Sequence, residues 1–337
     1  MNIREAIEKL VNRISLSEVE MVAVMNQIMT GEASPLQVAA FLTALRMKGE
    51  TVEEITGAAR VMREKAHRVN VGARTVLDTC GTGGDQKGTF NISTTTAFVL
   101  AGAGVNIAKH GNRSVSSQSG SADVLAALGV KVDAPKERVE QCIDRIGIGF
   151  LFAPLLHEAM KYAVQPRRDI GIRTIFNLLG PLTNPAMATH QLIGIYSGAM
   201  VAMIAQVLKN LGSMRAMVVH GSDGLDEISL CAATRVAELR NGEVKEYTID
   251  PEEFGLKRCP LEELHGGNPQ ESAVIVRNVL DGQKGSPRDV VVLNSGAALY
   301  VSGQAATIKD GLRLAADSID SGRARQKLEQ LIEMTNA

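Results

Sequence analysis

The amino-acid sequence predicts an α/β protein with a small all-helical domain and a larger α/β domain built on a central, mostly parallel sheet. Three observations lead to this expectation. The first seventy residues carry helical periodicity and helix-capping signals. From Thr75 onward, short apolar segments alternate with helical ones, which is typical of parallel βαβ units. The chain has 337 residues, more than the roughly 250–300 at which a single hydrophobic core stops growing.

The first seventy residues predict a bundle of short helices. Five apolar residues near the N-terminus fall on one helical face: Ile3, Ile7, Leu10, Val11 and Ile14. Capping boxes beginning at Ser17 and Thr51, and the pair Ser34-Pro35, indicate three further helix starts. We place the small domain at residues 1–70, with a helical return at about 163–185.

The larger domain is expected to comprise residues 71–162 and 186–337. Its first half is predicted to contain three strands, at 75–78, 105–108 and 130–132, with a helix at about 93–103 after the first. Further along, a helix at 198–211 precedes a strand at 216–220, and Asn241-Gly242 predicts a hairpin. The chain is expected to be helical again from about Ala305, with Ala315, Ala316, Ile319 and Leu328 as core contacts.

The composition argues against several classes of partner. The net charge is -1 and aromatic residues are only 3%, so neither a basic footprint nor a base-stacking platform for nucleic acid is evident. No segment reaches the roughly 18 apolar residues of a membrane span, and the N-terminus lacks the apolar core of a signal peptide. We therefore expect a cytoplasmic protein without nucleic-acid or membrane partners. Its four cysteines have no spacing typical of zinc sites or disulfide frameworks and are expected to be reduced thiols: Cys80, Cys142, Cys231 and Cys259.

Three segments that follow predicted strands carry groups suited to binding anions. The glycines of 78–85 (DTCGTGGD) let backbone N–H groups approach an anion closely. Residues 91–94 (NIST) fall at a helix start, where hydroxyls and free N–H groups suit phosphate. Residues 109–117 (KHGNRSVSS), followed by 120–123 (GSAD), combine cations, an amide and hydroxyls. Taken alone, the first segment could be only a tight turn, the second only a helix cap and the third only a solvated basic loop. Taken together, the three segments indicate a ligand with several phosphates.

Two pairs of charged residues are further candidates. Asp226-Glu227 follows a predicted strand, and hard carboxylate oxygens suit Mg²⁺, although such a pair is most often a solvated surface pair. Arg167-Arg168 could hold a planar carboxylate through two parallel hydrogen bonds, or could simply lie on a helix surface.

Taken in order, these motifs resemble the anthranilate phosphoribosyltransferase family. The resemblance rests on the segments quoted above together with RRDIGIRTIFNLLGPLTNP at 167–185, and it covers nearly the whole chain. It implies an enzyme of tryptophan biosynthesis that transfers the phosphoribosyl group of phosphoribosyl pyrophosphate to the amine of anthranilate. It also implies Mg²⁺ as cofactor, at two ions per subunit, and a homodimer assembled through the helical domains.

The resemblance also implies a role for each matching position. For phosphoribosyl pyrophosphate the implied binding residues are Gly81, Gly84, Asp85, Thr89, Asn91, Ile92, Ser93, Thr94, Lys109, His110, Gly111, Asn112, Arg113, Ser114, Val115, Ser116, Ser117 and Ser121. For anthranilate they are Gly81, Asn112 and Arg167, with Arg168 as a competitor of Arg167 for the carboxylate. For magnesium they are Ser93, Asp226 and Glu227. No general acid or base is assigned; His110 is the candidate, and a histidine that makes only a backbone hydrogen bond is the alternative.

The implied reaction is displacement of pyrophosphate from the anomeric carbon of ribose, which becomes cation-like as the bond breaks. The protein would then mainly stabilise the leaving group and align the amine. Two other interpretations remain open at this point. A pyrimidine nucleoside phosphorylase would need one phosphate site and no pyrophosphate–metal site. A non-catalytic nucleic-acid binder on the same fold would carry a basic surface and lack the acidic pair.

Overall fold

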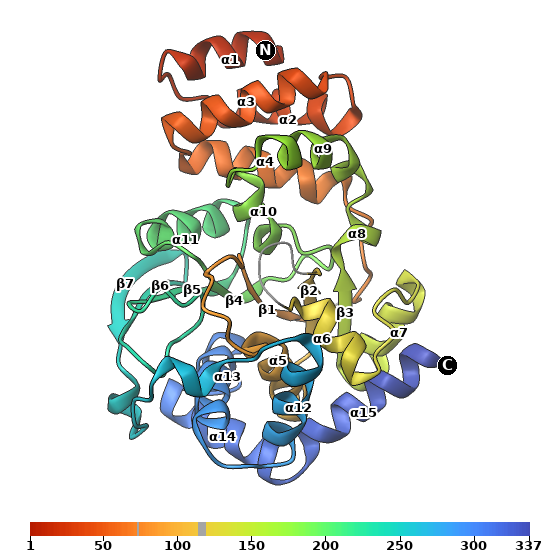
Figure 1. Cartoon of the computed structure of the whole chain (residues 1–337), viewed down its shortest axis with the longest axis vertical. Coiled ribbons are helices and arrows are strands. Elements are labelled where there is room, and N and C mark those ends of the chain that lie inside the picture. The colour runs from red at the N-terminus through yellow and green to blue at the C-terminus, as the bar shows by residue number, and fades with distance from the viewer. Residues whose placement is uncertain (73, 114–118) are drawn as a thin grey trace.

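The computed structural model describes residues 1–72, 74–113 and 119–337 and confirms the predicted fold class (Figure 1). A bundle of four helices forms the N-terminal end of the molecule: α1 (Ile3–Val11), α2 (Glu18–Thr30), α3 (Pro35–Lys48) and α4 (Val52–Lys65). A later helix, α9 (Lys161–Ile170), returns to this bundle and packs against α2 and α3. The remaining chain builds an α/β domain around a seven-stranded sheet.

Side-chain caps begin the helices of the bundle, as the sequence indicates. The capping boxes predicted at Ser17 and Thr51 are confirmed, and Ser34 makes a third one with Gln37. The predicted apolar face of the first helix is wrong at its end, because α1 stops at Val11 and the chain turns through Arg13 with φ of 59°. Val11 and Ile14 are consequently 63% and 52% exposed, whereas Ile3 and Leu10 are buried.

The sheet has the strand order β3-β2-β1-β4-β5-β6-β7. Its strands are β1 (Leu77–Gly81), β2 (Ile107–Gly111), β3 (Ile148–Phe152), β4 (His190–Gly194), β5 (Arg215–Gly221), β6 (Thr234–Arg240) and β7 (Glu243–Ile249). The first five strands are mutually parallel, and β6 and β7 continue the sheet in antiparallel fashion. The predicted hairpin is confirmed, with Asn241 and Gly242 both at positive φ between β6 and β7.

One expected strand is wrong, and one observed strand was missed. The third strand predicted at 130–132 is wrong: this segment forms no strand, and the edge strand is β3, after α7 (Lys136–Ile146). Val130 and Val132 are buried in the core without pairing, so their apolar character reflects packing and not sheet formation. The strand β4 was not predicted, although it is fully buried in the middle of the sheet.

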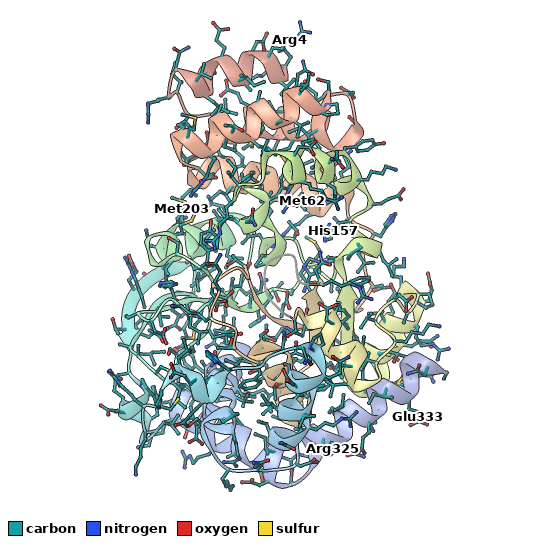
Figure 2. All side chains as sticks on the ribbon, viewed as in Figure 1. Arg4, Met62, His157, Met203, Arg325 and Glu333 are labelled. Atoms are coloured by element: carbon teal, nitrogen blue, oxygen red, sulfur yellow. The ribbon has the colours of Figure 1, made fainter. Side chains whose placement is uncertain are left out.

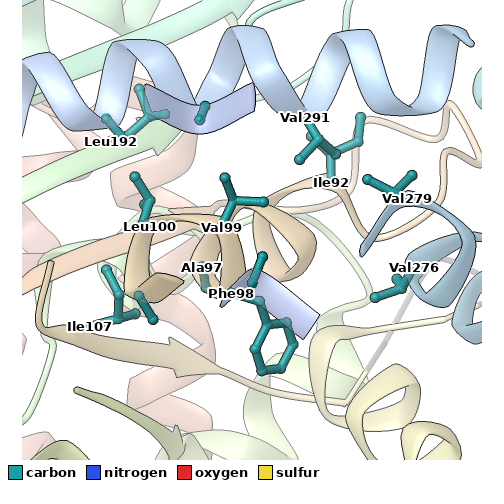
Figure 3. Packing of buried hydrophobic residues seen from close by; sticks show 14 of the residues in the cluster. Ile92, Ala97, Phe98, Val99, Leu100, Ile107, Leu192, Val276, Val279 and Val291 are labelled. Carbon is teal, nitrogen blue, oxygen red and sulfur yellow. The ribbon is translucent and has the colours of Figure 1, made fainter. Parts of the chain in front are cut away.

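Helices cover both faces of the sheet (Figure 1). One face packs against α5 (Ile92–Gly102), α13 (Ser286–Ser302) and the neighbouring α6 (Ser121–Leu128), α12 (Pro269–Leu280), α14 (Ile308–Asp320) and α15 (Arg323–Asn336). Figure 3 shows Val99 and Leu100 of α5 in this layer, together with Ile107, Leu192 and Val291. The other face packs against α11 (Val201–Asn210), and α10 (Phe176–Leu182) shares its core. Short elements complete the chain: α8 (Ala153–Leu156), η1 (Glu158–Met160), η2 (Gly198–Met200), η3 (Pro251–Phe254) and η4 (Leu261–Leu264).

The core of the helical bundle continues onto this second face of the sheet. Ile193 of β4 belongs to the same apolar cluster as the bundle, whereas Leu192, pointing the other way, belongs to the cluster around α5. Figure 2 marks Met62 and Met203, from α4 and α11, at this junction. Arg63 strengthens it, because its buried guanidinium donates to the carbonyl oxygen of Leu182 at 2.6 Å and to that of Leu211 at 3.2 Å. Both carbonyls lie at helix C-termini, where a cation is favoured.

Among the described residues, each helix is either too short or too polar to cross a lipid bilayer.

We predict that Glu54 is a major determinant of the stability of the helical domain. Its buried carboxylate accepts hydrogen bonds from the backbone N–H groups of Leu16 and Thr51 and from the buried ammonium of Lys48, at 2.8–2.9 Å. Glu54→Ala leaves the two N–H groups without a partner and the ammonium without its counter-ion, although Lys48 keeps its bonds to Ser15 and Gly49. The substitution should therefore lower the free energy of unfolding by about 3 kcal/mol. Urea denaturation followed by circular dichroism measures the loss.

The exposed neighbour Glu53 provides the matched control on the same helix. Glu53→Ala should change the free energy of unfolding by less than about 0.5 kcal/mol. Equal losses for the two variants would contradict the assignment.

Candidate active site

The motifs identified in the sequence meet at the carboxyl ends of the central strands. The chain passes from β1 to β2 and β3 on one side, then crosses to β4 on the other side of β1. Open α/β sheets bind ligands at such a reversal of strand order. The loop after β1, the N-terminus of α5, the end of β2 and the loop between β5 and β6 all reach this edge.

Glycines bring the acidic pair onto this edge. A side chain at Gly81, the last residue of β1, would place its Cβ 2.6 Å from a carboxylate oxygen of Asp226. A Cβ at Gly194, the last residue of β4, would collide with the backbone carbonyl of Asp226. The backbone N–H of Gly83 also donates to the Asp226 carboxylate at 2.8 Å. The loop with the acidic pair is therefore packed directly against the glycine-rich loop, residues 81–90.

The glycine-rich loop is held at both ends. The N–H of Thr82 donates to the carbonyl of Gly194 at 2.9 Å, and the N–H of Gly266 donates to the carbonyl of Gly88 at 2.8 Å. Thr89 forms a β-bridge with His265. Gly83 and Gly84 adopt φ of 66° and 76°, which favours glycine and turns the loop sharply over the strand end.

The acidic pair lies in an unfavourable field for negative charge. Burial, and then the neighbouring charge of Asp85, raise the pKa of Asp226 well above its usual value. Burial raises the pKa of Glu227 to about 8, although Lys109 and the N–H of Ser93 oppose the rise. A bound cation would relieve both carboxylates of this cost.

Asp226, Glu227 and Ser93 suit a magnesium ion that is bound only partly by the protein, and they do not form a complete metal site on their own. No group of three His, Cys, Asp or Glu side chains with metal-binding geometry occurs in residues 1–72, 74–113 and 119–337. Two carboxylates and a serine hydroxyl give hard oxygen ligands, and Mg²⁺ commonly completes such a set with water and substrate phosphate. The acidic pair lies beside the glycine-rich loop, whose N–H groups could hold such a substrate phosphate next to the ion.

Lys109 lies behind the site. Its ammonium is buried and donates to the carbonyl of Thr79 at 2.5 Å and to the hydroxyl of Ser93 at 3.2 Å. Burial lowers its pKa, and the charges of Asp78 and Glu227 oppose that shift. Lys109 therefore fixes the first turn of α5 against β1 and adds positive potential below it.

The N-terminus of α5 is formed by the NIST segment. Asn91 is the N-cap residue, but its side chain accepts from the hydroxyl of Thr94 and caps no backbone N–H. The carbonyl of Ser93 accepts from the hydroxyl of Thr79 at 3.0 Å. The first turn is thus braced by side chains from inside the protein, and Ser93 stays partly exposed.

His110 is buried next to another histidine. Its Nδ1 pairs with the carbonyl of Gly180 at 3.1 Å, and its Nε2 has no hydrogen-bond partner among the described residues. Burial, and then His157 with its ring centroid 5.1 Å away, lower the pKa of His110 to about 3. The imidazole is therefore neutral at physiological pH and poorly matched to a general base.

The remaining residues of this segment surround the start of α6. The hydroxyl of Ser121 donates to the carbonyl of Asn112 at 3.3 Å, and Arg113 pairs with Asp123 at 2.9 Å. A Cβ at Gly111 would collide with Ser121, so glycine permits this close approach. Ser114, Val115, Ser116 and Ser117 lie outside the described residues.

The structure distinguishes the two adjacent arginines. Arg167 is partly buried, with its guanidinium 5.2 Å from the ring centroid of Phe176, and burial lowers its pKa. Arg168 is exposed.

Arg173 was not singled out, although it lies in the quoted segment 167–185. It donates to the carbonyl of Gly84 and stacks 4.3 Å from the ring centroid of Tyr196. It joins the helical return to the glycine-rich loop.

Asp78 and Asn184 were also quoted without a role. The amide of Asn184 donates to the buried carboxylate of Asp78 and to the carbonyl of Ala108, both at 2.7 Å. The second carboxylate oxygen of Asp78 accepts from the N–H of His110 at 3.1 Å. Both residues therefore align β1 and β2 and do not face a ligand directly.

Comparisons with known proteins agree over the full length of the chain. The helical bundle domain of a glycosyl transferase family matches residues 4–66, and the a/b domain of that family matches residues 73–325. The anthranilate phosphoribosyltransferase of Geotalea uraniireducens (strain Rf4) is 56% identical over 348 residues, covering 99% of both chains. That of Syntrophobacter fumaroxidans (strain DSM 10017 / MPOB) is 57% identical over 334 residues, with the same coverage.

Solved structures give the same result. The anthranilate phosphoribosyltransferase of Thermus thermophilus superposes with a TM-score of 0.93 at 45% identity, covering 98% of this chain and 99% of that one. The enzyme from Saccharomyces cerevisiae in complex with PRPP and Mg superposes with a TM-score of 0.90 at 28% identity, covering 99% and 98%.

We predict that Glu227 destabilises the metal-free protein as pH rises. Its folded pKa of about 8 exceeds the ordinary value of 4.5, so between these values the folded state keeps a proton that the unfolded state has lost. Stability is lost across this window, and the loss is complete above it. Glu227→Gln removes the titration. Its Tm relative to the parent, in chelator, should therefore increase from about pH 5 to about pH 8.5.

Differential scanning calorimetry in chelator and in Mg²⁺ checks this expectation. Mg²⁺ should reduce the benefit of the substitution at the higher pH, since it favours the ionised carboxylate. Glu262→Gln, at an exposed position, is the control and should give a Tm difference independent of pH. A pH-independent difference for Glu227→Gln would be inconsistent with a desolvated carboxyl.

Proposed function

The chain belongs to the anthranilate phosphoribosyltransferase family, and from that premise we propose that the site at the carboxyl ends of β1, β2 and β4 carries out this family's reaction. The enzyme transfers the phosphoribosyl group of phosphoribosyl pyrophosphate to the amine of anthranilate. The products are N-(5-phosphoribosyl)anthranilate and pyrophosphate, and the step belongs to tryptophan biosynthesis. The two alternatives kept open by the sequence, a nucleoside phosphorylase and a nucleic-acid binder, are thereby set aside.

One observation supports this placement most strongly: Asp226 lies against the glycine-rich loop, within hydrogen-bond distance of Gly83. A departing pyrophosphate needs both N–H donors and a cation. This contact brings together the loop that offers the N–H donors and the carboxylate that would bind the cation. A phosphorylase that binds only inorganic phosphate has no need of a metal beside its phosphate loop.

Ser93, Asp226 and Glu227 would hold Mg²⁺, and we propose two ions per subunit. Asp85 raises the pKa of both acidic residues, so a third carboxylate lies within electrostatic range of the pair. Three clustered carboxylates favour more positive charge than one ion supplies. When bound, the metal neutralises charge on the leaving pyrophosphate.

The donor substrate would be held by backbone and hydroxyl groups. Gly81, Gly84, Asp85 and Thr89 belong to the glycine-rich loop, and residues Asn91–Thr94 begin α5, where the helix dipole favours anions. The buried Lys109 would contribute without contacting the substrate, because its ammonium donates to the Ser93 hydroxyl and adds positive potential beneath the first turn of α5. Gly111, Asn112, Arg113 and Ser121 would form the opposite side of the site, at the end of β2. Residues 114–117, assigned to the same substrate, lie outside the described residues.

Anthranilate would bind between the helical return and the end of β2. Arg167 is partly buried over an aromatic ring, so its guanidinium is positioned to meet a carboxylate on an aromatic acid. Asn112 and Gly81 would complete the contact. The aromatic amine attacks as the neutral group and loses its proton afterwards. No general base is assigned, because a pKa of about 3 makes the buried imidazole of His110 too weak a base for the role at neutral pH.

We also propose that the helical domain forms a homodimer interface. Large apolar side chains are exposed on this domain: Val11, Ile14, Val19, Leu36 and Met47. Apolar exposure of this kind commonly marks protein–protein contacts.

Replacing the acidic pair tests the metal site. Asp226→Asn and Glu227→Gln should each lower kcat by about 10²-fold or more and raise the Mg²⁺ concentration for half-maximal rate, because each removes a hard anionic ligand. The decrease in anthranilate fluorescence, followed at varied Mg²⁺, measures both quantities. Glu262→Gln is the control. Normal rates with unchanged Mg²⁺ dependence in both variants would exclude the pair from the metal site.

Replacing the adjacent arginines separately tests the acceptor site. Arg167→Ala should raise the KM for anthranilate by about 10–100-fold, which corresponds to the loss of a hydrogen bond between charged groups. The KM for phosphoribosyl pyrophosphate should change much less. Arg168→Ala, at the exposed neighbour, should leave both constants nearly unchanged. A similar rise of both KM values for Arg167→Ala would argue against a specific contact with the carboxylate.

A further inference from the structure

Two of the four cysteines are neighbours in space, although 28 positions separate them in the sequence. The sulfur atoms of Cys231 and Cys259 lie 3.7 Å apart, and both residues are partly buried. Cys231 is in the loop between β5 and β6, and Cys259 lies between η3 and η4. Cys80 and Cys142 are buried elsewhere, in β1 and α7.

The backbone around Cys231 is fixed. Its N–H donates to the hydroxyl of Ser229 at 2.9 Å, and that hydroxyl donates to the carboxylate of Asp223 at 2.7 Å. The side chain of the fully buried Asn294 bonds both the N–H and the carbonyl of Ile228. Cys231 therefore meets Cys259 in a defined arrangement and not through the drift of a loose loop.

The distance leaves little to be closed. A disulfide has its sulfurs about 2.05 Å apart, so the two atoms must approach by less than about 2 Å. Small rotations of two partly exposed side chains can supply this. Both residues pack at the margin of the same apolar cluster, so such rotations leave the surrounding core in place.

We propose that Cys231 and Cys259 are a modification site that forms an intramolecular disulfide on exposure to a low-molecular-weight disulfide. In the first exchange, the thiolate of one cysteine attacks the reagent, forms a mixed disulfide and releases one thiol. In the second, the other cysteine attacks the protein sulfur of that mixed disulfide and releases the second thiol. The protein gives up two protons and two electrons, and the reagent is reduced to two thiols.

The bond would join the two segments that border the active site. Cys231 follows the acidic pair by four residues, in the loop packed against the glycine-rich loop. Cys259 precedes residues 264–266, whose backbone bonds hold Gly88, Thr89 and Phe90. The disulfide would therefore restrain the loop of the acidic pair relative to the far end of the glycine-rich loop.

The same surroundings set the conditions under which the bond forms. Burial and the neighbouring thiol of Cys259, followed by the charge of Asp223, raise the pKa of the Cys231 thiol to about 12. Since the thiolate is the reactive form, this raised pKa makes exchange at Cys231 slow. In a reducing environment both thiols therefore persist. The pair responds to sustained oxidation.

Oxidised glutathione and the full-length protein provide the test. After incubation at about pH 8.5, two of the four thiols should be lost, and peptide mass mapping should find Cys231 joined to Cys259 within one molecule. The Tm should rise by about 5 °C, because the bond closes a loop in the unfolded chain. Subsequent reduction with dithiothreitol should restore both thiols and the original Tm.

Three variants separate this site from general oxidation. Cys231→Ser and Cys259→Ser should each take up glutathione reversibly at the remaining cysteine, without cross-linking and without the rise in Tm. Cys142→Ala, at a buried cysteine in α7, should still form the cross-link. Stable mixed disulfides at both cysteines of the parent protein, or a cross-link only between molecules, would overturn the proposal. Retention of all four thiols after the same incubation would also overturn it.

Discussion

The site depends on the close packing of Asp226 against the ends of β1 and β4. This contact requires glycine at Gly81 and at Gly194, because a Cβ at either position would enter the space of Asp226. It also places the Asp226 carboxylate on the N–H of Gly83. One packed unit therefore contains both the carboxylate that would bind the metal ion and the loop whose N–H groups would bind the phosphates. Neither could move alone without breaking the other's support.

Such packing has an electrostatic cost that the protein only partly offsets. Asp226 and Glu227 have raised pKa values because they are desolvated close to Asp85, and Lys109 is the opposing cation for Glu227. Lys109 is itself buried and committed to Thr79 and Ser93, so it cannot move toward a ligand without abandoning these partners. The residual cost is stored in the metal-free site. A divalent cation and a diphosphate substrate together would recover it, which favours their joint binding in the proposed reaction.

The sequence predicts these features where the signal is local. The capping boxes at Ser17 and Thr51 and the Asn241-Gly242 turn depend on near neighbours, and the structure confirms all three. The failures arise where tertiary packing decides. Val132 is apolar because it is buried without pairing, and Val11 is exposed because α1 ends there. The role of Arg173, and the proximity of Cys231 to Cys259, depend on segments distant in sequence. Neither leaves a spacing pattern.

The division between the two apolar cores bears on how the proposed reaction is organised. The glycine-rich loop and α5 rest on the cluster that includes Phe90 and Ile92, whereas Phe176, beneath Arg167, belongs to the cluster shared with the helical bundle. In the proposed assignment, the first core carries the groups that bind phosphoribosyl pyrophosphate, and the second carries Arg167, which would bind the carboxylate of anthranilate. The separation of amine and anomeric carbon is then set by how the two cores meet. Arg173 crosses that boundary by donating to the backbone carbonyl of Gly84, whereas both carbonyls bound by Arg63 lie on the side of the helical bundle. Because effective molarity falls steeply with misalignment, Arg173 would influence the rate without contacting either substrate.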